Sequence, residues 1–207
     1  MNNVLILLDN PDDWKPYCET KSILTVSDYL KNKPVEKDRK LVINLSNDYS
    51  YNSEGYYCSL LAQTRGQRVI PDVDIINKLE TGTGIRMDRS LRALCYQWIQ
   101  KNGIKSDIWY LNIYFGKCRE KGLERVARFI FENYPCPLLR VALNTHPKNQ
   151  IESIQFLPLN RLDDEEQDFF ANTLDNFNKK IWSAPKSAKA PRYSLAVLID
   201  PKEKFPP

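Results

Sequence analysis

The sequence has little of the chemistry that most often marks a metal or redox protein. It contains one histidine and five cysteines in 207 residues, and no two cysteines form a C-x-x-C pair. Zinc sites built from thiolates usually show such close pairs, so no metal site is expected. Scattered single thiols are typical of a reducing compartment, and we therefore expect a cytoplasmic protein.

Long apolar runs and a strong net charge are also missing. No stretch approaches the roughly 20 consecutive apolar residues that cross a bilayer. The first apolar run, residues 4–8, is too short for a secretion signal, has no basic flank and is followed by acidic residues. The formal net charge of +4 is small for this length, whereas nucleic-acid binders usually concentrate many more Lys and Arg on one face. We therefore expect neither a membrane nor a nucleic acid as partner.

The glycine patterns that cradle phosphates are incomplete. The segment Thr81-Gly82-Thr83-Gly84 has two glycines after a predicted helix, whereas a dinucleotide fingerprint needs three directly after a strand. The segment after Leu45 has neither glycines before residue 55 nor a G-K-[ST] triplet, so it is not a P-loop. We expect no nucleotide cofactor in this chain.

What the sequence does contain is a clear β-loop-α-β unit over residues 41–71. Residues 41–45 form a short apolar run typical of a strand buried on both faces. After the polar segment 46–52, Ser53 is a candidate N-cap for a helix that ends near Gly66. The expected apolar stripe of that helix is Tyr56, Tyr57, Leu60, Leu61 and Thr64, widened by Cys58 and Ala62. Residues 68–71 resume as a strand, and parallel pairing of the two strands places a ligand at the loop 46–53.

The rest of the chain alternates short strands and amphipathic helices. Residues 23–30 suggest a short strand leading into a helical turn, and helices are predicted at 72–79, from Asp88 to Gly103, at 121–134 and after residue 163. Strands are predicted at 107–115, 138–143, 151–157 and 195–199, with a hairpin loop at 144–149. The predicted fold is therefore α/β: a mixed sheet with a central parallel β-α-β unit, a late antiparallel hairpin and helices on the sheet faces. We expect one globular domain over residues 1–207, with a linker-like surface segment at 183–191.

The loop 46–53 and its flanks supply the candidate site. Tyrosine combines a flat apolar ring with one hydroxyl, which suits a small organic ligand or a peptide. The predicted substrate-binding residues are Asn44, Asn47, Tyr49, Tyr51, Tyr56, Arg65 and Arg68. The loop tyrosines belong either to a site or to the core, and for the helix tyrosines Tyr56 and Tyr57 the core is favoured. Arg65, Arg68 and the arginines of 86–92 can bind carboxylates or phosphates, but a solvated face paired with nearby Asp residues is favoured.

Two further motifs have an alternative to their functional interpretation. Cys58 lies near the start of a helix, where the dipole stabilises a thiolate, and His146 is the only histidine that can serve as its base. Cys58 also shares a face with Ala62, which favours burial as a small hydrophobic side chain. The acidic run 163–166 is explained by helix capping and does not require a metal.

Several segments together resemble a known family. The run from Tyr49 to Pro71 reads Y-x-Y-x-x-x-G-Y-Y-x-S-L-L-A-x-x-R-G-x-R-V-I-P, and further similar segments lie at 114–116, 126–131, 137–141 and 192–201. They resemble the N-terminal domain that precedes the catalytic part of RimK-like ATP-grasp ligases. The resemblance covers nearly the whole chain, but the ATP-grasp domain itself is not included.

The resemblance implies an accessory role. RimK-like ligases join amino acids such as glutamate to an acceptor amine, and ATP and Mg²⁺ are expected only in the ligase domain. The implied partner is a C-terminal ATP-grasp ligase domain, and the chain would bind or present a small-molecule or peptide acceptor, or dock that domain, without being a catalyst itself. Two alternatives remain open: a free-standing hydrolase or transferase that uses the loop after Leu45 with Cys58, and a dimerisation or docking module that forms a homo-oligomer.

Overall fold

The first half of the chain forms a parallel sheet. The structure is a computed structural model that describes residues 4–15, 23–31, 41–82, 86–146 and 151–179. The strands are β1 (Val4–Leu8), β2 (Ile23–Thr25), β3 (Leu41–Asn44) and β4 (Arg68–Ile70), in the order β2-β1-β3-β4. All three pairings are parallel, so the predicted parallel β-α-β unit is confirmed.

The second half forms a separate antiparallel sheet. Its strands are β5 (Ile108–Tyr114), β6 (Leu138–Asn144) and β7 (Ile151–Phe156), in the order β5-β6-β7. The mixed α/β class and the late hairpin are confirmed, with one difference in detail. The parallel and antiparallel strands form two sheets because β5 to β7 pair with each other through local connections. The predicted segment 183–191 and the predicted strand 195–199 lie outside the described residues.

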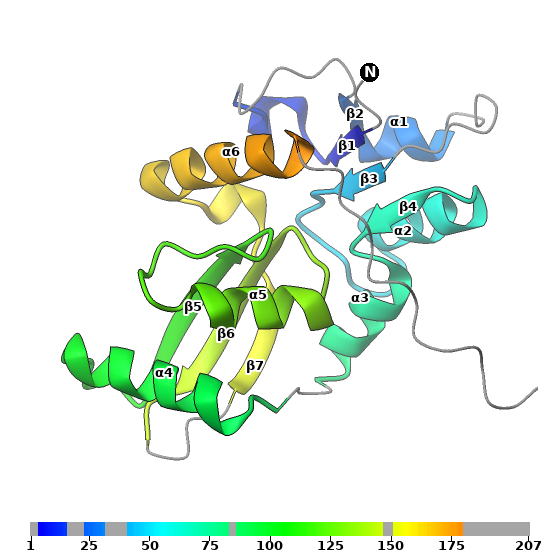
Figure 1. The fold of residues 1–207 in the computed structure, drawn as a ribbon. Coiled ribbons are helices and arrows are strands. Elements are labelled where there is room, and N and C mark those ends of the chain that lie inside the picture. Colours follow the sequence, from blue (N-terminus) through cyan, green and yellow to red (C-terminus); the bar gives the residue numbers. More distant parts are fainter. Residues whose placement is uncertain (1–3, 16–22, 32–40, 83–85, 147–150, 180–207) are drawn as a thin grey trace, which may run out of the picture.

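Six α-helices and two short 3₁₀ helices are described between and around the strands (Figure 1). In the first half these are η1 (Pro11–Asp13), α1 (Val26–Lys31), α2 (Glu54–Thr64) and α3 (Val73–Glu80). In the second half they are α4 (Arg89–Lys101), α5 (Glu124–Asn133), η2 (Leu159–Arg161) and α6 (Asp164–Lys179). The side chains of Ser53, Asp72 and Asp88 each accept a hydrogen bond from the first turn of α2, α3 and α4. Polar caps thus set these helix starts where the sequence predicted them.

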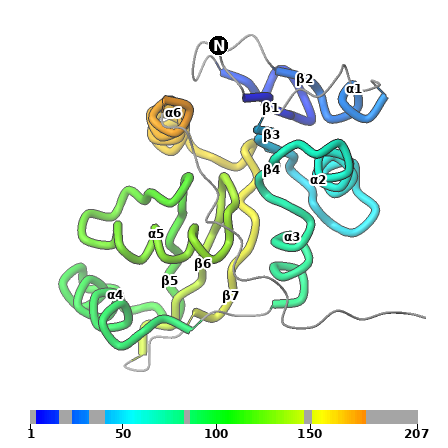
Figure 2. Tube along the Cα trace, turned by 45° about the vertical axis from the view of Figure 1, so that its right-hand side comes forward, coloured from blue at the N-terminus to red at the C-terminus, as the bar shows by residue number. Residues whose placement is uncertain are grey.

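The core connects the two sheets through α6. Helices α1 and α2 cover one face of the parallel sheet, whereas α4 and α5 cover one face of the antiparallel sheet. Between the sheets, Phe170 and Leu174 of α6 pack in one apolar cluster with residues of both sheets (Figures 1 and 2). That cluster includes Ile6, Leu8, Ile43, Leu45 and Ile70 from the first half, and Tyr114, Phe115 and Leu138 from the second.

The buried face of α2 differs from the predicted stripe. Gly55, Tyr56, Cys58, Ser59 and Ala62 are buried, while Tyr57 and Leu60 are 42% and 38% exposed. Thr64 is also exposed. Apart from Tyr56, the buried residues are small, because α2 lies close against the sheet and bulky side chains have no room there. The prediction that Tyr57 belongs to the core is therefore wrong, and Tyr56 is confirmed as buried.

Candidate functional site

The strand order fixes where a ligand site is expected in the parallel sheet. The chain passes from β1 to β2 on one side and then to β3 on the other side of β1. Open α/β sheets bind ligands at such a switch point, beside the carboxyl ends of the two strands. Leu7 of β1 is in register with Asn44 of β3, so Asp9 and the loop 46–53 leave the sheet at this point.

A carboxylate of the chain itself occupies the switch point. Asp9 accepts hydrogen bonds from the Ser46 hydroxyl at 2.7 Å and from the Asn47 backbone N–H at 2.7 Å. In phosphate-binding α/β folds, backbone N–H groups at this point donate hydrogen bonds to the bound anion. Here the carboxylate of Asp9 takes the place of that anion.

The loop holds itself in shape through further hydrogen bonds. Six of its eight backbone N–H groups, those of residues 46, 47, 48, 50, 51 and 53, donate to acceptors within the chain. Among them, the Tyr51 N–H donates to Glu80 Oε1 of α3 at 3.1 Å. Ser53 caps α2 by accepting from the Tyr56 N–H and also donates its hydroxyl to the Asp48 carbonyl. The loop therefore has a fixed shape, and most of its backbone N–H groups are already used.

Asn44 anchors this loop to the helix. Its side-chain amide is fully buried and donates to the Gly55 carbonyl at 2.8 Å and to Ser59 Oγ at 3.0 Å. The Ser59 hydroxyl in turn donates to the Pro71 carbonyl at 2.8 Å. Asn44 Oδ1 accepts from the Ser46 N–H. The side chain thus ties the end of β3 to α2, and its hydrogen-bonding groups are used inside the fold.

The four tyrosines divide into a buried and an exposed pair. Tyr49 is buried, donates its hydroxyl to the Asn44 carbonyl at 2.7 Å and packs against Phe156 with ring centroids 4.3 Å apart. Burial raises the pKa of the Tyr49 hydroxyl well above its ordinary value. Tyr51 is 69% exposed and meets Tyr56 edge-on, at 5.6 Å between ring centroids. Tyr57 donates its hydroxyl to Asn52 Oδ1 at 2.9 Å and keeps its ring at the surface.

Asn47 joins the loop to both halves of the chain. Its amide nitrogen lies 3.5 Å from Asp13 Oδ2 of η1, and its Oδ1 accepts from the Asn160 N–H of η2 at 3.4 Å. The structure therefore brings Asn44, Asn47, Tyr49, Tyr51 and Tyr56 together at the carboxyl edge of the parallel sheet. Tyr51 is the most accessible of the five.

The two predicted arginines lie at the other end of α2. Arg68 begins β4 and is in register with Leu41, the first residue of β3. Arg65 is the C-cap of α2, donates to the Tyr29 carbonyl at 3.3 Å and stacks its guanidinium 4.7 Å from the centre of the Tyr29 ring. Since α2 has 11 residues and a helix rises about 1.5 Å per residue, Arg65 stands roughly three turns from the loop.

The thiol of Cys58 is buried, and its Sγ donates to the Val26 carbonyl at 3.6 Å. Burial raises its pKa to about 12, so the group is a neutral thiol near pH 7. His146 lies at the end of β6 in the other sheet, with its Nε2 3.6 Å from Asp107 Oδ1. This arrangement argues against Cys58 as an activated nucleophile.

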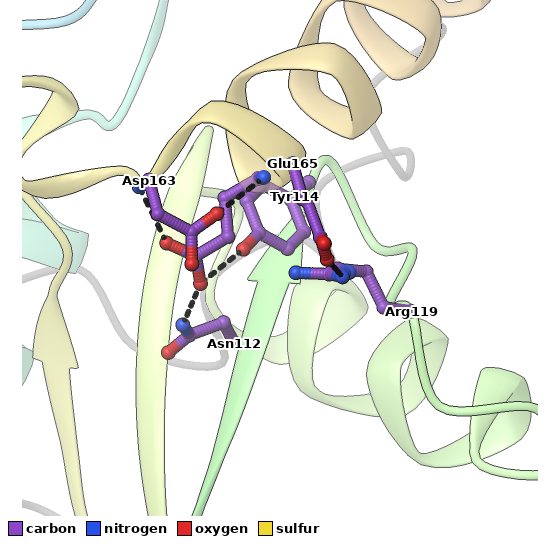
Figure 3. A network of polar contacts seen from close by, with 6 residues as sticks. Asn112, Tyr114, Arg119, Asp163 and Glu165 are labelled. Atoms are coloured by element: carbon purple, nitrogen blue, oxygen red, sulfur yellow. Dashed lines mark hydrogen bonds and ion pairs between the residues drawn. The ribbon is translucent and has the colours of Figure 1, made fainter.

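A polar network joins α6 to β5 (Figure 3): helix capping by the acidic run 163–166 was predicted, but its contacts to β5 were not. Glu166 is buried, and its Oε1 accepts from the Asn112 amide at 2.5 Å and the Tyr114 hydroxyl at 2.9 Å. Its Oε2 accepts from the Asp163 N–H, while Asp163 Oδ1 accepts from the Glu166 N–H. This reciprocal pair is a capping box. Only the D-x-x-E spacing marks it in the sequence, and the contacts to β5 leave no local signal.

Two properties of the described residues bear on metals and membranes. Within these residues, no three or more His, Cys, Asp or Glu side chains are grouped so that they could hold a metal ion. In the same part of the chain, every helix is too short or too polar to cross a bilayer.

Fold and site together define an α/β domain in which a self-bonded, tyrosine-bearing loop occupies the switch point of a parallel sheet. Residues 26–173 match the family model of the RimK-like ATPgrasp N-terminal domain. The match extends from α1 into α6 and covers well over half of the chain, so this chain belongs to that family, and the resemblance found in the sequence is confirmed. Searches of curated proteins and of solved structures gave no significant match.

Proposed function

We propose that this chain is a non-catalytic accessory domain of a RimK-like ATP-grasp ligase, which binds the acceptor substrate or docks the ligase domain. The recognition surface is the tyrosine face, defined as Tyr51, Tyr57 and Leu60. One observation carries this proposal: Tyr51 keeps 69% of its side chain exposed on a loop that is otherwise internally bonded. Such exposure of a large aromatic ring on an ordered loop is typical of a binding surface.

The fixed loop favours binding because little conformational freedom remains to be lost. Immobilising a flexible side chain or loop on association costs about 0.5–1.5 kcal/mol per rotamer-rich side chain. Tyr51 is held at its backbone by Glu80, and its ring rests edge-on against the buried Tyr56. A partner that covers the ring therefore gains apolar burial with a small entropic cost.

The chemical groups of the tyrosine face and its surroundings suggest which step each domain carries out. Phenol rings, amides and carboxylates suit recognition, while the activating chemistry of an ATP-grasp ligase needs a nucleotide clamp and magnesium ligands. In the proposed arrangement the ligase module supplies ATP and Mg²⁺, and this domain positions either the acceptor or the module.

The test measures binding of this chain to a RimK-like ATP-grasp ligase module supplied as a separate polypeptide. Isothermal titration calorimetry is run with wild type, with Tyr51→Ala and with Tyr57→Ala. We expect each substitution to weaken binding by about tenfold, the size of a modest interface hot spot. Tyr96→Ala on α4, a site 37% exposed in the other half of the chain, is the matched control and should bind as wild type does.

The acceptor branch is tested with the same three variants. A thermal-shift screen with amino acids and short peptides should give a melting-temperature rise that Tyr51→Ala removes and Tyr96→Ala retains. The proposal would be overturned if Tyr51→Ala and Tyr57→Ala changed neither the affinity for the ligase module nor the ligand-induced rise in melting temperature.

A second candidate function is self-association through β5. Ile108 and Tyr110 of this edge strand are 43% and 55% exposed, and the strand contains no charged residue. Edge strands that lack charge are templates for pairing with another copy. Light scattering over a dilution series should show a dimer that Tyr110→Lys dissociates; a monomer at every concentration would exclude this candidate.

A further inference from the structure

The segments that meet at the switch point carry one sign of charge. Residues 4–14 and 41–64 contain five carboxylates, Asp9, Asp12, Asp13, Asp48 and Glu54, and no Lys or Arg. Glu80 joins them, because its carboxylate accepts the Tyr51 N–H. The whole chain, in contrast, has a formal net charge of +4. The acidic character of this edge is therefore local.

Among the described residues, three basic groups lie next to these segments without belonging to them. Lys15 follows η1 and lies 3.5 Å from Asp164 of α6. Arg161 follows Asn160, which contacts Asn47, and Lys78 precedes Glu80 by two residues on α3. None of the three belongs to the loop 46–53 or to α2.

Most backbone N–H groups of the loop 46–53 are already used. Its backbone N–H groups at residues 46–48, 50, 51 and 53 are already bonded within the chain. The Tyr57 hydroxyl donates to Asn52, which leaves its oxygen to accept. An anionic ligand therefore cannot bind through those six backbone N–H groups, as anions do in phosphate-binding loops, whereas an ammonium or guanidinium group supplies only donors.

The exposed rings complete the match to a cation. Tyr51 and Tyr57 present ring surface to solvent on either side of Tyr56. A Lys or Arg side chain over such a ring gains about 0.5–1 kcal/mol at an exposed site, and nearby carboxylates add attraction that weakens with salt.

From these observations we infer that the tyrosine face, together with Asp48 and Glu54, docks a Lys- or Arg-containing polypeptide segment. This inference rests on the proposed function and names the chemistry of its partner. A polypeptide is favoured over a single small amine because the exposed groups come from two elements, Asp48 and Tyr51 from the loop and Glu54 and Tyr57 from α2, with the rings of Tyr51 and Tyr57 centred 5.6 and 5.9 Å from that of Tyr56.

The experiment uses fluorescence anisotropy with a labelled hexalysine peptide, and hexaglutamate as the opposite charge. We expect hexalysine to bind and hexaglutamate not to bind. The affinity for hexalysine should fall at least about fivefold between roughly 50 and 300 mM salt. Asp48→Asn with Glu54→Gln keeps acceptor oxygens in place and should weaken binding about fivefold or more, as should Tyr51→Ala.

The matched control neutralises two exposed carboxylates elsewhere, Glu132 of α5 and Asp168 of α6, as Glu132→Gln with Asp168→Asn. Its affinity for hexalysine should equal that of wild type. The inference would be overturned if both double variants lost the same affinity for hexalysine, if that affinity did not change with salt, or if hexalysine did not bind at all. Lysine amide binding as tightly as hexalysine would overturn it too, because the occupant would then be a small amine.

The two proposals fail in distinguishable ways. If the ligase module still binds through Tyr51 while Asp48→Asn with Glu54→Gln has no effect on either ligand, the accessory function stands and the basic-segment inference is lost. If hexalysine binds as expected but neither module binding nor the acceptor screen depends on Tyr51, the tyrosine face still docks a basic segment and the accessory function is lost.

Discussion

At the scale of single residues, the environment of each cysteine decides its chemistry. The four described cysteines, Cys58, Cys95, Cys118 and Cys136, are all buried and unpaired. Burial raises their pKa values to about 12, 11, 12 and 12 in that order. A thiol with such a pKa forms almost no thiolate near neutral pH, and the thiolate is the reactive species.

We therefore expect no described cysteine to react in the folded protein. The measurement is thiol titration with a chromogenic disulfide in a Cys18→Ser variant, at neutral and mildly alkaline pH. All four thiols should react only after denaturant is added. Fast reaction of Cys58 in the folded chain, tested by its loss in Cys58→Ser, would restore the hydrolase alternative.

Glu120 is a second residue whose environment has a measurable consequence. Its Oε2 is buried and has no hydrogen-bond partner among the described residues, and burial raises the pKa of its carboxyl above the ordinary value of 4.5. Because the folded pKa is above the unfolded one, the folded chain binds more protons between the two values. Stability is therefore lost as pH rises through that window.

Glu120→Gln should remove this loss. We expect the variant to have a higher urea midpoint than wild type at pH 7, with the difference shrinking as pH falls toward the ordinary carboxyl pKa of 4.5. Glu132→Gln on the exposed side of α5 is the control and should show no such trend. A variant that is less stable than wild type at pH 7 would show that the carboxylate is favourably solvated.

At the scale of elements, the fit of α2 against its loop depends on one glycine. A Cβ at Gly55 would lie 2.2 Å from the Asp48 carbonyl and 2.6 Å from Ser46 Oγ. Gly66, after α2, has φ +71° and nothing within 4 Å of an added Cβ. The two positions therefore separate a steric cost from a cost of backbone conformation.

Gly55→Ala should destabilise the chain by about 1–3 kcal/mol through overpacking and should also displace the loop. Gly66→Ala should cost about 1 kcal/mol and leave the loop in place. Urea unfolding gives the stabilities, and hexalysine binding reports on the loop. If Gly55→Ala binds hexalysine as well as Gly66→Ala does, the loop tolerates the shift and its fixed shape is not required.

The sequence predicted an element correctly where the residues that define it contact neighbours close in sequence. Ser53, Asp72 and Asp88 mark helix starts because the cap contacts its own helix, and the alternating and apolar runs marked β3, β5, β6 and β7. The buried face of α2 was predicted incorrectly because hydrophobicity favoured Tyr57 and Leu60, while close packing selected Gly55 and Ser59. The Glu166 contacts to Asn112 and Tyr114 bridge over 50 positions of sequence, and no local pattern reports them.

The sequence predicted the position of the candidate site better than it predicted which side chains face the surface there. The β-loop-α unit places residues 46–53 at a strand end whatever the details, since topology alone decides that. Whether Tyr49 faces inward and Tyr51 outward depends on the turn between them, which the sequence does not specify. Arg65 and Arg68 are close to Tyr56 in sequence and distant in the fold because α2 separates them.

At the scale of the whole molecule, α6 joins the two sheets through one shared core. Phe170 is fully buried in the cluster that contains β1, β3 and β4 residues as well as Tyr114 and Leu138. We therefore propose that the described part of the chain unfolds as one cooperative unit, consistent with the single domain expected from the sequence.

Phe170→Ala should destabilise this unit by about 3–5 kcal/mol, the usual cost of removing a buried aromatic ring. Circular dichroism and tryptophan fluorescence should still give coincident urea transitions. Phe129→Ala, a partly buried position in the α4–α5 cluster, is the comparison and should cost less. Two separated transitions in the Phe170 variant would divide the chain into independently folding halves.

Asp9 has a further consequence for an enzyme assembled around this domain. Its carboxylate lies at the switch point, where doubly wound proteins receive the phosphates of a mononucleotide, and it already accepts hydrogen bonds from the Asn47 N–H and the Ser46 hydroxyl. In the proposed assembly we therefore expect this domain, which carries its own carboxylate in this position, not to compete with the ligase module for ATP.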